Sequence, residues 1–333
     1  MEKLRLLSRI QEIRKYMVET SLLTKQLRSK FVKDYQLPIQ VVQSPYFEQH
    51  LKLLEDSHGA NTKYLILLET IRDKFDGNMQ KFLEYRHSVE DQILSYILNS
   101  EAYKDFNSDK NGIVGETPVV GSPELYTKEQ CNHFFVSYDM VKANFQALRF
   151  ANPAIVRDCE TYEQFIEKFT DIDYFKYAKQ LRQSIFGKLN GKRTSALEKL
   201  ISNKFAKELA SRFEGKMKLY SIKTDEIILK FTGTEEEFNK LKVENEEFSG
   251  FKFRVNKFKL LSQDFKHATS ERLLTAYIKE DYLNGHRRTL HCVPDTYYPQ
   301  VYKLLNGMEI NDSDLVFYYE HELSRFLNPL ELV

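Results

Sequence analysis

The segment Lys218-Leu-Tyr-Ser-Ile-Lys-Thr-Asp-Glu-Ile-Ile-Leu-Lys-Phe231 contains two short apolar runs on either side of Thr224-Asp225. Short runs rich in β-branched and aromatic residues predict strands, and aspartate is common in the turns that join them. We therefore predict a β-hairpin that folds about Thr224-Asp225.

Two further stretches predict strands that could join this hairpin in one sheet. His133–Tyr138 is a short buried run, and Phe251–Leu260 begins with apolar residues that alternate with Lys252 and Arg254. Tyr174–Leu189 and Ser195–Phe213 carry helical periodicity between them. The expected fold class is therefore α+β, an antiparallel sheet with helices on one face.

The flanking regions are predicted to be helical. Apolar residues spaced four, three and four apart begin an amphipathic pattern in residues 3–34, and helical patterns continue to Tyr103. A stretch rich in glycine and proline follows, which suggests a linker. The sequence predicts a helical N-terminal domain at 1–106, a linker at 107–126, an α+β domain at 127–262 and a helical region at 263–333. The clearest helices in the last region are expected at Tyr297–Leu305 and Asp312–Leu327.

The composition is ordinary for a globular protein and excludes several classes. Of the 333 residues, 42% are hydrophobic and 29% are charged, and no apolar run approaches the roughly 20 residues needed to span a bilayer. The N-terminus lacks the features of a secretory signal, so we expect a cytoplasmic protein without a membrane span. Three scattered cysteines suggest neither a disulfide framework nor a zinc site.

The charge is concentrated in one region, although the net charge of the chain is only +1. Residues 176–218 contain twelve basic and three acidic residues, a local net charge of +9. A solvated helix face usually mixes both signs, whereas a basic block is typical of a surface that binds phosphates. The block favours nucleic acid as a partner, with Lys188, Lys192 and Arg193 as candidate contacts; a plain charged surface is the alternative.

The order of three motifs suggests an activity. Lys179-Gln-Leu-Arg-Gln-Ser-Ile-Phe-Gly187 stands between Asp139, at the end of the first predicted strand, and Asp225, in the hairpin turn. This order resembles motifs A, B and C of polymerase palms. The resemblance implies that the antiparallel sheet of residues 127–262 is a palm-like catalytic domain and that the helical region at 263–333 is thumb-like. The middle motif is similar to the pattern K-x3-N-S-x-Y-G of family B DNA polymerases, with Gln183 and Phe186 as conservative replacements.

The resemblance covers roughly residues 133–231 and departs from the family in several places. Lys223 stands where family B has the first aspartate of motif C, and Thr224-Asp225-Glu226 looks more like the motif C of family A. Asn144 stands where family B has the tyrosine that excludes ribose. The interval between motifs A and B is short, and no segment resembles a proofreading exonuclease.

The resemblance implies a role for each matched residue. Asp139 and Asp225 would hold two Mg²⁺ ions, assisted by Glu226, because carboxylate oxygens suit this metal and two ions can neutralise both ends of a phosphoryl transfer. Lys179, Arg182 and Gln183 share one helix face and would contact the triphosphate. Phe186 would stack on the base pair, Gly187 would let the backbone approach the template, and Asn144 would contact the sugar.

These features together predict a template-directed nucleotidyltransferase, a minimal DNA or RNA polymerase. Its expected partners are a nucleic acid primer–template and nucleoside triphosphates, and the N-terminal helices could bind a protein partner. One alternative is a catalytically inactive palm-like protein that binds nucleic acid. The other is a helical scaffold without nucleotide chemistry.

Overall fold

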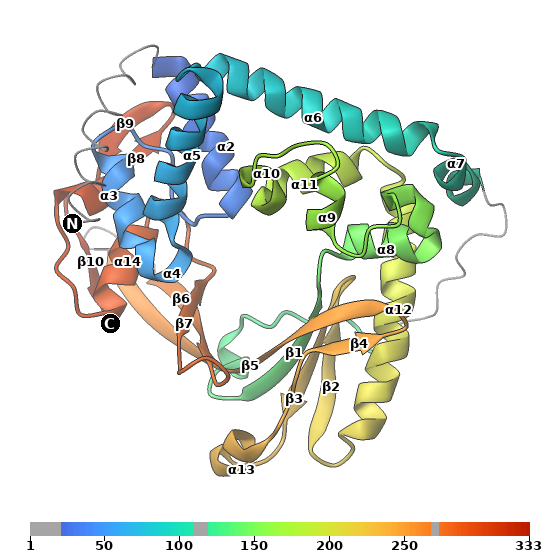
Figure 1. Ribbon diagram of the computed structural model, residues 1–333. Coiled ribbons are helices and arrows are strands. Elements are labelled where there is room, and N and C mark those ends of the chain that lie inside the picture. Colours follow the sequence, from blue (N-terminus) through green and yellow to red (C-terminus); the bar gives the residue numbers. More distant parts are fainter. Residues whose placement is uncertain (1–20, 109–118, 268–272) are drawn as a thin grey trace, which may run out of the picture.

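The computed structural model describes residues 21–108, 119–267 and 273–333 of the chain (Figure 1). The first part of the helix predicted for residues 3–34 and the centre of the predicted linker therefore lie outside the described residues. No helix in the described ranges is both long and apolar enough to cross a membrane.

Residues 21–108 are helical, as predicted. The helices are α2 (Ser21–Tyr35), α3 (Tyr46–Leu53), α4 (Glu55–His58), α5 (Ala60–Phe75), α6 (Met79–Asn99) and α7 (Glu101–Ser108). Helix α5 is followed by its C-cap residue Asp76, which adopts a left-handed conformation with φ 54°. Helix α6 is preceded by its N-cap residue Asn78, whose side chain accepts a hydrogen bond from the Lys81 backbone N–H at 3.0 Å. These caps explain the sharp corner between the two long helices in Figure 1.

A second group of helices lies between the first and second strands. It comprises α8 (Ala143–Ala151), α9 (Tyr162–Ile166), α10 (Tyr174–Tyr177), α11 (Lys179–Gly187) and α12 (Gly191–Arg212), with the 3₁₀ turn η2 (Pro153–Val156). The helix predicted for Tyr174–Leu189 is divided, because Ala178 is extended (ψ 90°). Asn190 caps α12 by accepting a hydrogen bond from the Arg193 N–H at 3.2 Å.

One antiparallel sheet follows the order β2-β3-β1-β5-β6-β7, and β4 and β10 pair with β5. The strands are β1 (Phe134–Met140), β2 (Met217–Ile222), β3 (Glu226–Phe231), β4 (Glu246–Phe248), β5 (Phe251–His267), β6 (Leu273–Asp281), β7 (Arg288–His291) and β10 (Leu330–Leu332). The predicted hairpin is confirmed as β2–β3, and the predicted strands at His133–Tyr138 and Phe251–Leu260 correspond to β1 and β5.

The first four strands of the sheet form a recognisable unit. Strand β1 is followed by α12, the β2–β3 hairpin, the short helix α13 (Glu235–Lys240) and β5, and the spatial order is β5-β1-β3-β2. This is the β-α-β-β-α-β arrangement of a split β-α-β fold, with α8–α11 inserted after β1. The chain therefore has an α+β fold with β1 in the centre of this unit.

Alternation along the strands gives the sheet two different faces. Val136, Tyr138 and Met140 of β1 belong to a core cluster with Leu197, Ile201 and Phe205 of α12. Phe135 of β1 lies in a different cluster, with Ile228, Phe258, Leu260 and Leu125. Helix α12 therefore covers one face, and the segment around Leu125 covers part of the other.

The largest core cluster joins the N-terminal helices to those that follow β1. It includes Leu27 and Phe31 of α2, Phe82 of α6, and Leu181 and Ile185 of α11. Buried polar contacts strengthen the junction: Asp34 accepts two hydrogen bonds from the Arg86 guanidinium, at 2.8 and 3.0 Å, and one from the Tyr174 hydroxyl at 2.6 Å. The predicted division at residues 106 and 127 stays a prediction, and this core extends across it.

The prediction of a helical region at 263–333 is wrong. Helix α14 (Tyr298–Leu305) matches the predicted Tyr297–Leu305, but the end of β5 and all of β6, β7 and β10 extend the sheet. The helix predicted at Asp312–Leu327 is instead the 3₁₀ turn η3 (Asp312–Leu315) and a hairpin of β8 (Val316–Tyr319) and β9 (Glu322–Arg325). Glu320 and His321 form its tight turn with positive φ angles of 47° and 70°.

Candidate functional site

The predicted carboxylates meet where β1 ends beside the β2–β3 turn. Asp139 lies directly opposite Glu226 in the antiparallel register of β1 and β3. The Met140 N–H donates a hydrogen bond of 2.7 Å to the Asp225 carbonyl oxygen, so Asp225 lies at the same end of the two strands. The 86 residues that separate Asp139 from Asp225 in sequence are therefore no obstacle to a shared site.

Asp139 lies on the sheet face opposite α12. Its neighbours Tyr138 and Met140 are buried against that helix, so alternation directs Asp139 to the other side, together with its partner Glu226. The Asp139 side chain is 34% exposed. Burial raises the pKa of Asp139, and the negative charges of Asp225 and Glu226 raise it further, while Arg254 opposes them. Asp225 and Glu226 are thus close enough to Asp139 for their charges to influence its pKa.

Arg254 is a site residue that the motif comparison missed. It lies directly opposite Asp139 in the register of β1 and β5, and its Nη2 donates a hydrogen bond of 2.9 Å to Asp139 Oδ2. The alternation of residues 251–255 could have placed Arg254 on the polar face of its strand. Its partnership with Asp139 depends on a register between strands more than 100 residues apart in sequence.

Glu198 is a fourth carboxyl group near the turn. It belongs to α12 and is 3% exposed, and its Oε1 has no hydrogen-bond partner among the described residues. Burial, with a smaller contribution from the charge of Asp225, raises the pKa of Glu198 to about 7. One helical turn further on, the Ser202 hydroxyl donates to the Thr224 carbonyl oxygen at 3.1 Å, which fixes the hairpin turn on α12. Sequence reasoning gave no reason to select Glu198.

Helix α11 places Lys179 where the charges of Asp139 and Asp225 influence its pKa. Burial lowers the pKa of Lys179, and the charge of Arg182 acts in the same direction, while Asp139 and Asp225 oppose the shift. Lys179 Nζ donates a hydrogen bond of 2.6 Å to Gln36 Oε1 of the loop after α2. Arg182 lies 5.5 Å from the centre of the Tyr162 ring, and burial lowers its pKa. Lys179 thus interacts with the two aspartates through their charges, whereas its hydrogen bond is to Gln36.

The other residues of the middle motif differ in accessibility. Gln183 and Gly187 are exposed, and a Cβ at Gly187 would meet no atom within 4 Å. Phe186 is only 4% exposed and packs edge-on against Tyr162, with 6.2 Å between the ring centres. The expectation that Phe186 stacks on a base pair therefore needs correction, because this ring is buried in the core. Asn144 is half-buried in the first turn of α8, shortly after β1.

The predicted nucleic-acid contacts are partly engaged within the protein. Lys188 Nζ lies 2.8 Å from Glu90 Oε1 of α6, and the Arg193 guanidinium lies 5.1 Å from the centre of the Phe106 ring. Lys192 is exposed at the beginning of α12. Elsewhere in the basic block, Lys176 pairs with Glu167 and Asp173, and Arg212 pairs with Glu208 and Glu246. Part of the +9 charge is thus neutralised by acidic residues from outside the block.

The donor set at the strand ends suits Mg²⁺ only in part. Carboxylate oxygens are the ligands that Mg²⁺ prefers, and this ion commonly takes one or two carboxylates and completes its shell with water and substrate phosphates. Within residues 21–108, 119–267 and 273–333, no group of three or more His, Cys, Asp or Glu side chains is arranged to hold a metal ion. Asp139 and Asp225 could therefore hold Mg²⁺ only together with such exchangeable ligands.

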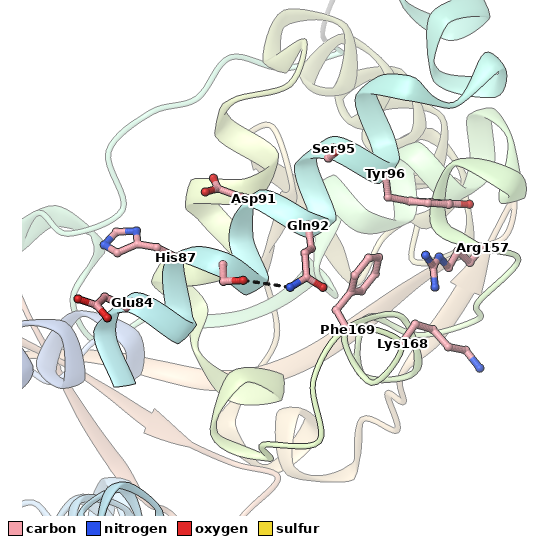
Figure 2. A pocket seen from close by; sticks show the side chains of 10 residues that line it. Glu84, His87, Asp91, Gln92, Ser95, Tyr96, Arg157, Lys168 and Phe169 are labelled. Atoms are coloured by element: carbon pink, nitrogen blue, oxygen red, sulfur yellow. Dashed lines mark hydrogen bonds between the residues drawn. The ribbon is translucent and has the colours of Figure 1, made fainter. Parts of the chain in front are cut away.

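A surface groove lies away from these residues, along α6 (Figure 2). Its volume is about 860 Å³, and its lining includes Asp91 and Gln92 of α6. At one end the Arg157 guanidinium packs against two rings, 4.4 Å from the centre of Tyr96 and 4.5 Å from that of Phe169. None of the predicted site residues lines this groove.

Comparisons with protein-family models, curated proteins and solved structures found no match for this chain. The class of protein that the site suggests therefore rests on the motifs, the strand topology and the contacts described above.

Proposed function

We propose that the protein is a template-directed nucleotidyltransferase that joins nucleotides by metal-dependent phosphoryl transfer. The observation that carries this proposal is that Asp139, near the end of β1, and Asp225, in the adjoining β2–β3 turn, lie at the same end of the sheet, and that the charges of both influence the pKa of Lys179 on α11. The β5-β1-β3-β2 order supports it, because that order places the two aspartates at one end of the sheet.

Each residue has a distinct part in the proposed reaction. Mg²⁺ held by Asp139 and Asp225 would supply charge neutralisation for the attacking hydroxyl and the leaving pyrophosphate. Lys179 would bind the triphosphate through its charged ammonium group. Arg182, about one helical turn further along α11, would donate hydrogen bonds to the triphosphate from its planar guanidinium. Glu226 would add negative charge beside Asp139. The exposed basic residues of α12 would hold the nucleic acid backbone.

A nucleic-acid-binding protein without catalytic activity is the second candidate. One observation favours it: the Arg254 guanidinium already neutralises Asp139 at 2.9 Å. The Arg254 guanidinium could take the place of a metal ion at Asp139. The protein would then bind nucleic acid through its basic surface and would not catalyse phosphoryl transfer.

An incorporation assay tests the proposal. The full chain is incubated with Mg²⁺, labelled ribo- and deoxyribonucleoside triphosphates, and DNA and RNA primer–templates. We expect incorporation by the wild type, its loss in Asp139→Asn and Asp225→Asn, and its retention in Asp171→Asn, whose carboxylate is exposed and pairs with Lys74. Melting temperatures within a few degrees would show that the variants fold, since surface substitutions change stability little.

The results separate the candidates. Wild-type rates in either Asp139→Asn or Asp225→Asn would refute the proposed roles of these residues. Binding of the primer–template without incorporation under any of these conditions would favour the second candidate, because both candidates share the basic surface and only one performs chemistry.

A further inference from the structure

Arg254 and Asp139 form an ion pair at the centre of the candidate site. The two residues lie directly opposite each other on β5 and β1, so both side chains are on the same face of the sheet. The Arg254 side chain is 63% exposed, and Arg254 Nη2 is 2.9 Å from Asp139 Oδ2. The guanidinium is therefore anchored at one oxygen and has room to leave it.

A second cation nearby is held in a different way. Lys279 of β6 is also on this face, and its pKa is lowered mainly by burial while the charges of Glu226 and Asp139 oppose that shift. Its ammonium lies 4.4 Å from the centre of the Phe258 ring and 5.7 Å from that of Tyr126. Lys279 thus interacts with Asp139 only by charge, whereas Arg254 also donates a hydrogen bond to it.

We propose that Arg254 is the resident counter-ion of Asp139 and that a divalent cation must displace it in order to bind there. The inference rests on the proposed function, because it takes Asp139 as a metal ligand. Oδ2 would have to exchange its Arg254 contact for the metal, since a divalent ion bound at roughly 2.0–2.2 Å would strongly repel a guanidinium only 2.9 Å from the same oxygen.

The size of the effect follows from the exposure of the pair. An exposed ion pair contributes little to stability, so its loss should change metal affinity by at most about fivefold, which corresponds to about 1 kcal/mol. Arg254 would therefore reduce metal occupancy at low metal concentration without preventing binding at high concentration.

The test is calorimetric titration of the full chain with Mn²⁺ alone, at low ionic strength and without nucleotide. We expect Arg254→Gln to bind Mn²⁺ about two to five times more tightly than the wild type. Lys279→Gln removes the same charge without removing a contact with Asp139 and should give a smaller increase. Arg288→Gln removes a comparable exposed pair, with Glu280 at 3.2 Å on β6, and should leave the affinity unchanged.

Asp139→Asn makes the outcomes distinguishable. If it loses Mn²⁺ binding and Arg254→Gln binds more tightly than Lys279→Gln, the counter-ion proposal is supported. If it loses binding but Arg254→Gln is unchanged, weaker or equal to Lys279→Gln, the counter-ion proposal is overturned while the metal site stands. If Asp139→Asn binds like the wild type, or no protein binds Mn²⁺, both the counter-ion proposal and the proposed metal site are overturned.

Discussion

Glu198 should make the stability of this protein depend on pH in a defined direction. Its pKa rises from an ordinary 4.5 to about 7 because it is buried beneath the hairpin turn, near the charge of Asp225. Between these two values the unfolded chain has lost the proton and the folded protein still holds it, so the free energy of unfolding falls as pH rises. The total loss is about 3 kcal/mol once the pH exceeds 7.

Glu198→Gln should remove this loss, since the amide has the shape of the neutral acid and cannot ionise. We expect the stability difference between Glu198→Gln and the wild type to grow by about 3 kcal/mol from about pH 4 to about pH 8.5, measured by urea unfolding without metal. Glu214→Gln, at an exposed position after the same helix, serves as the control and should follow the wild type. Parallel pH profiles for Glu198→Gln and the wild type would refute the assignment of a neutral, buried carboxyl group.

The remaining predictions concern the fold, the basic block and the sugar. Asp34→Asn should destabilise the protein by about 3–5 kcal/mol in thermal or urea unfolding, because it leaves the buried Arg86 charge uncompensated; an unchanged midpoint would contradict this. Binding to a primer–template should weaken steeply with salt, and a flat response would identify residues 176–218 as an ordinary solvated surface. Asn144→Tyr should shift nucleotide preference toward deoxyribonucleotides, because the larger ring would block a 2′-hydroxyl; strong deoxyribonucleotide preference in the unmutated protein would show that Asn144 is not the gate.

The sequence predicted those helices and strands whose apolar periodicity matches the face that they bury in the structure. The β2–β3 hairpin was predictable because two apolar runs enclose a turn at Thr224-Asp225, and the long α6 because its periodicity is sustained between clear caps. The C-terminal region was not predictable in this way, because periodicity alone cannot assign a short apolar run to a strand or to a helix. Val316-Phe-Tyr-Tyr319 is rich in residues that favour strands, and this composition could have indicated β8.

The candidate site shows the same division. Asp139 could be selected because it ends an apolar run, and Asp225 because it lies in a predicted hairpin turn, and the structure brings them to one end of the sheet. The Arg254 contact could not be predicted, because it depends on the register of β1 and β5. Phe186 misled the motif comparison, because the side of α11 that carries its ring packs into the core against Tyr162. Whether a residue of a motif faces solvent or core is decided by packing, which the motif alone does not contain.

The most direct test of the central claim is a crystal structure with Mn²⁺ and a non-hydrolysable nucleoside triphosphate. The proposed function predicts anomalous density for a metal ion within roughly 2.0–2.3 Å of carboxylate oxygens of both Asp139 and Asp225, with triphosphate oxygens on the same ion. It also predicts that Lys179 contacts the phosphates and that Arg254 has left Asp139. A metal and nucleotide bound elsewhere, with the Arg254–Asp139 pair intact, would contradict the claim that these two aspartates form a nucleotidyltransferase centre.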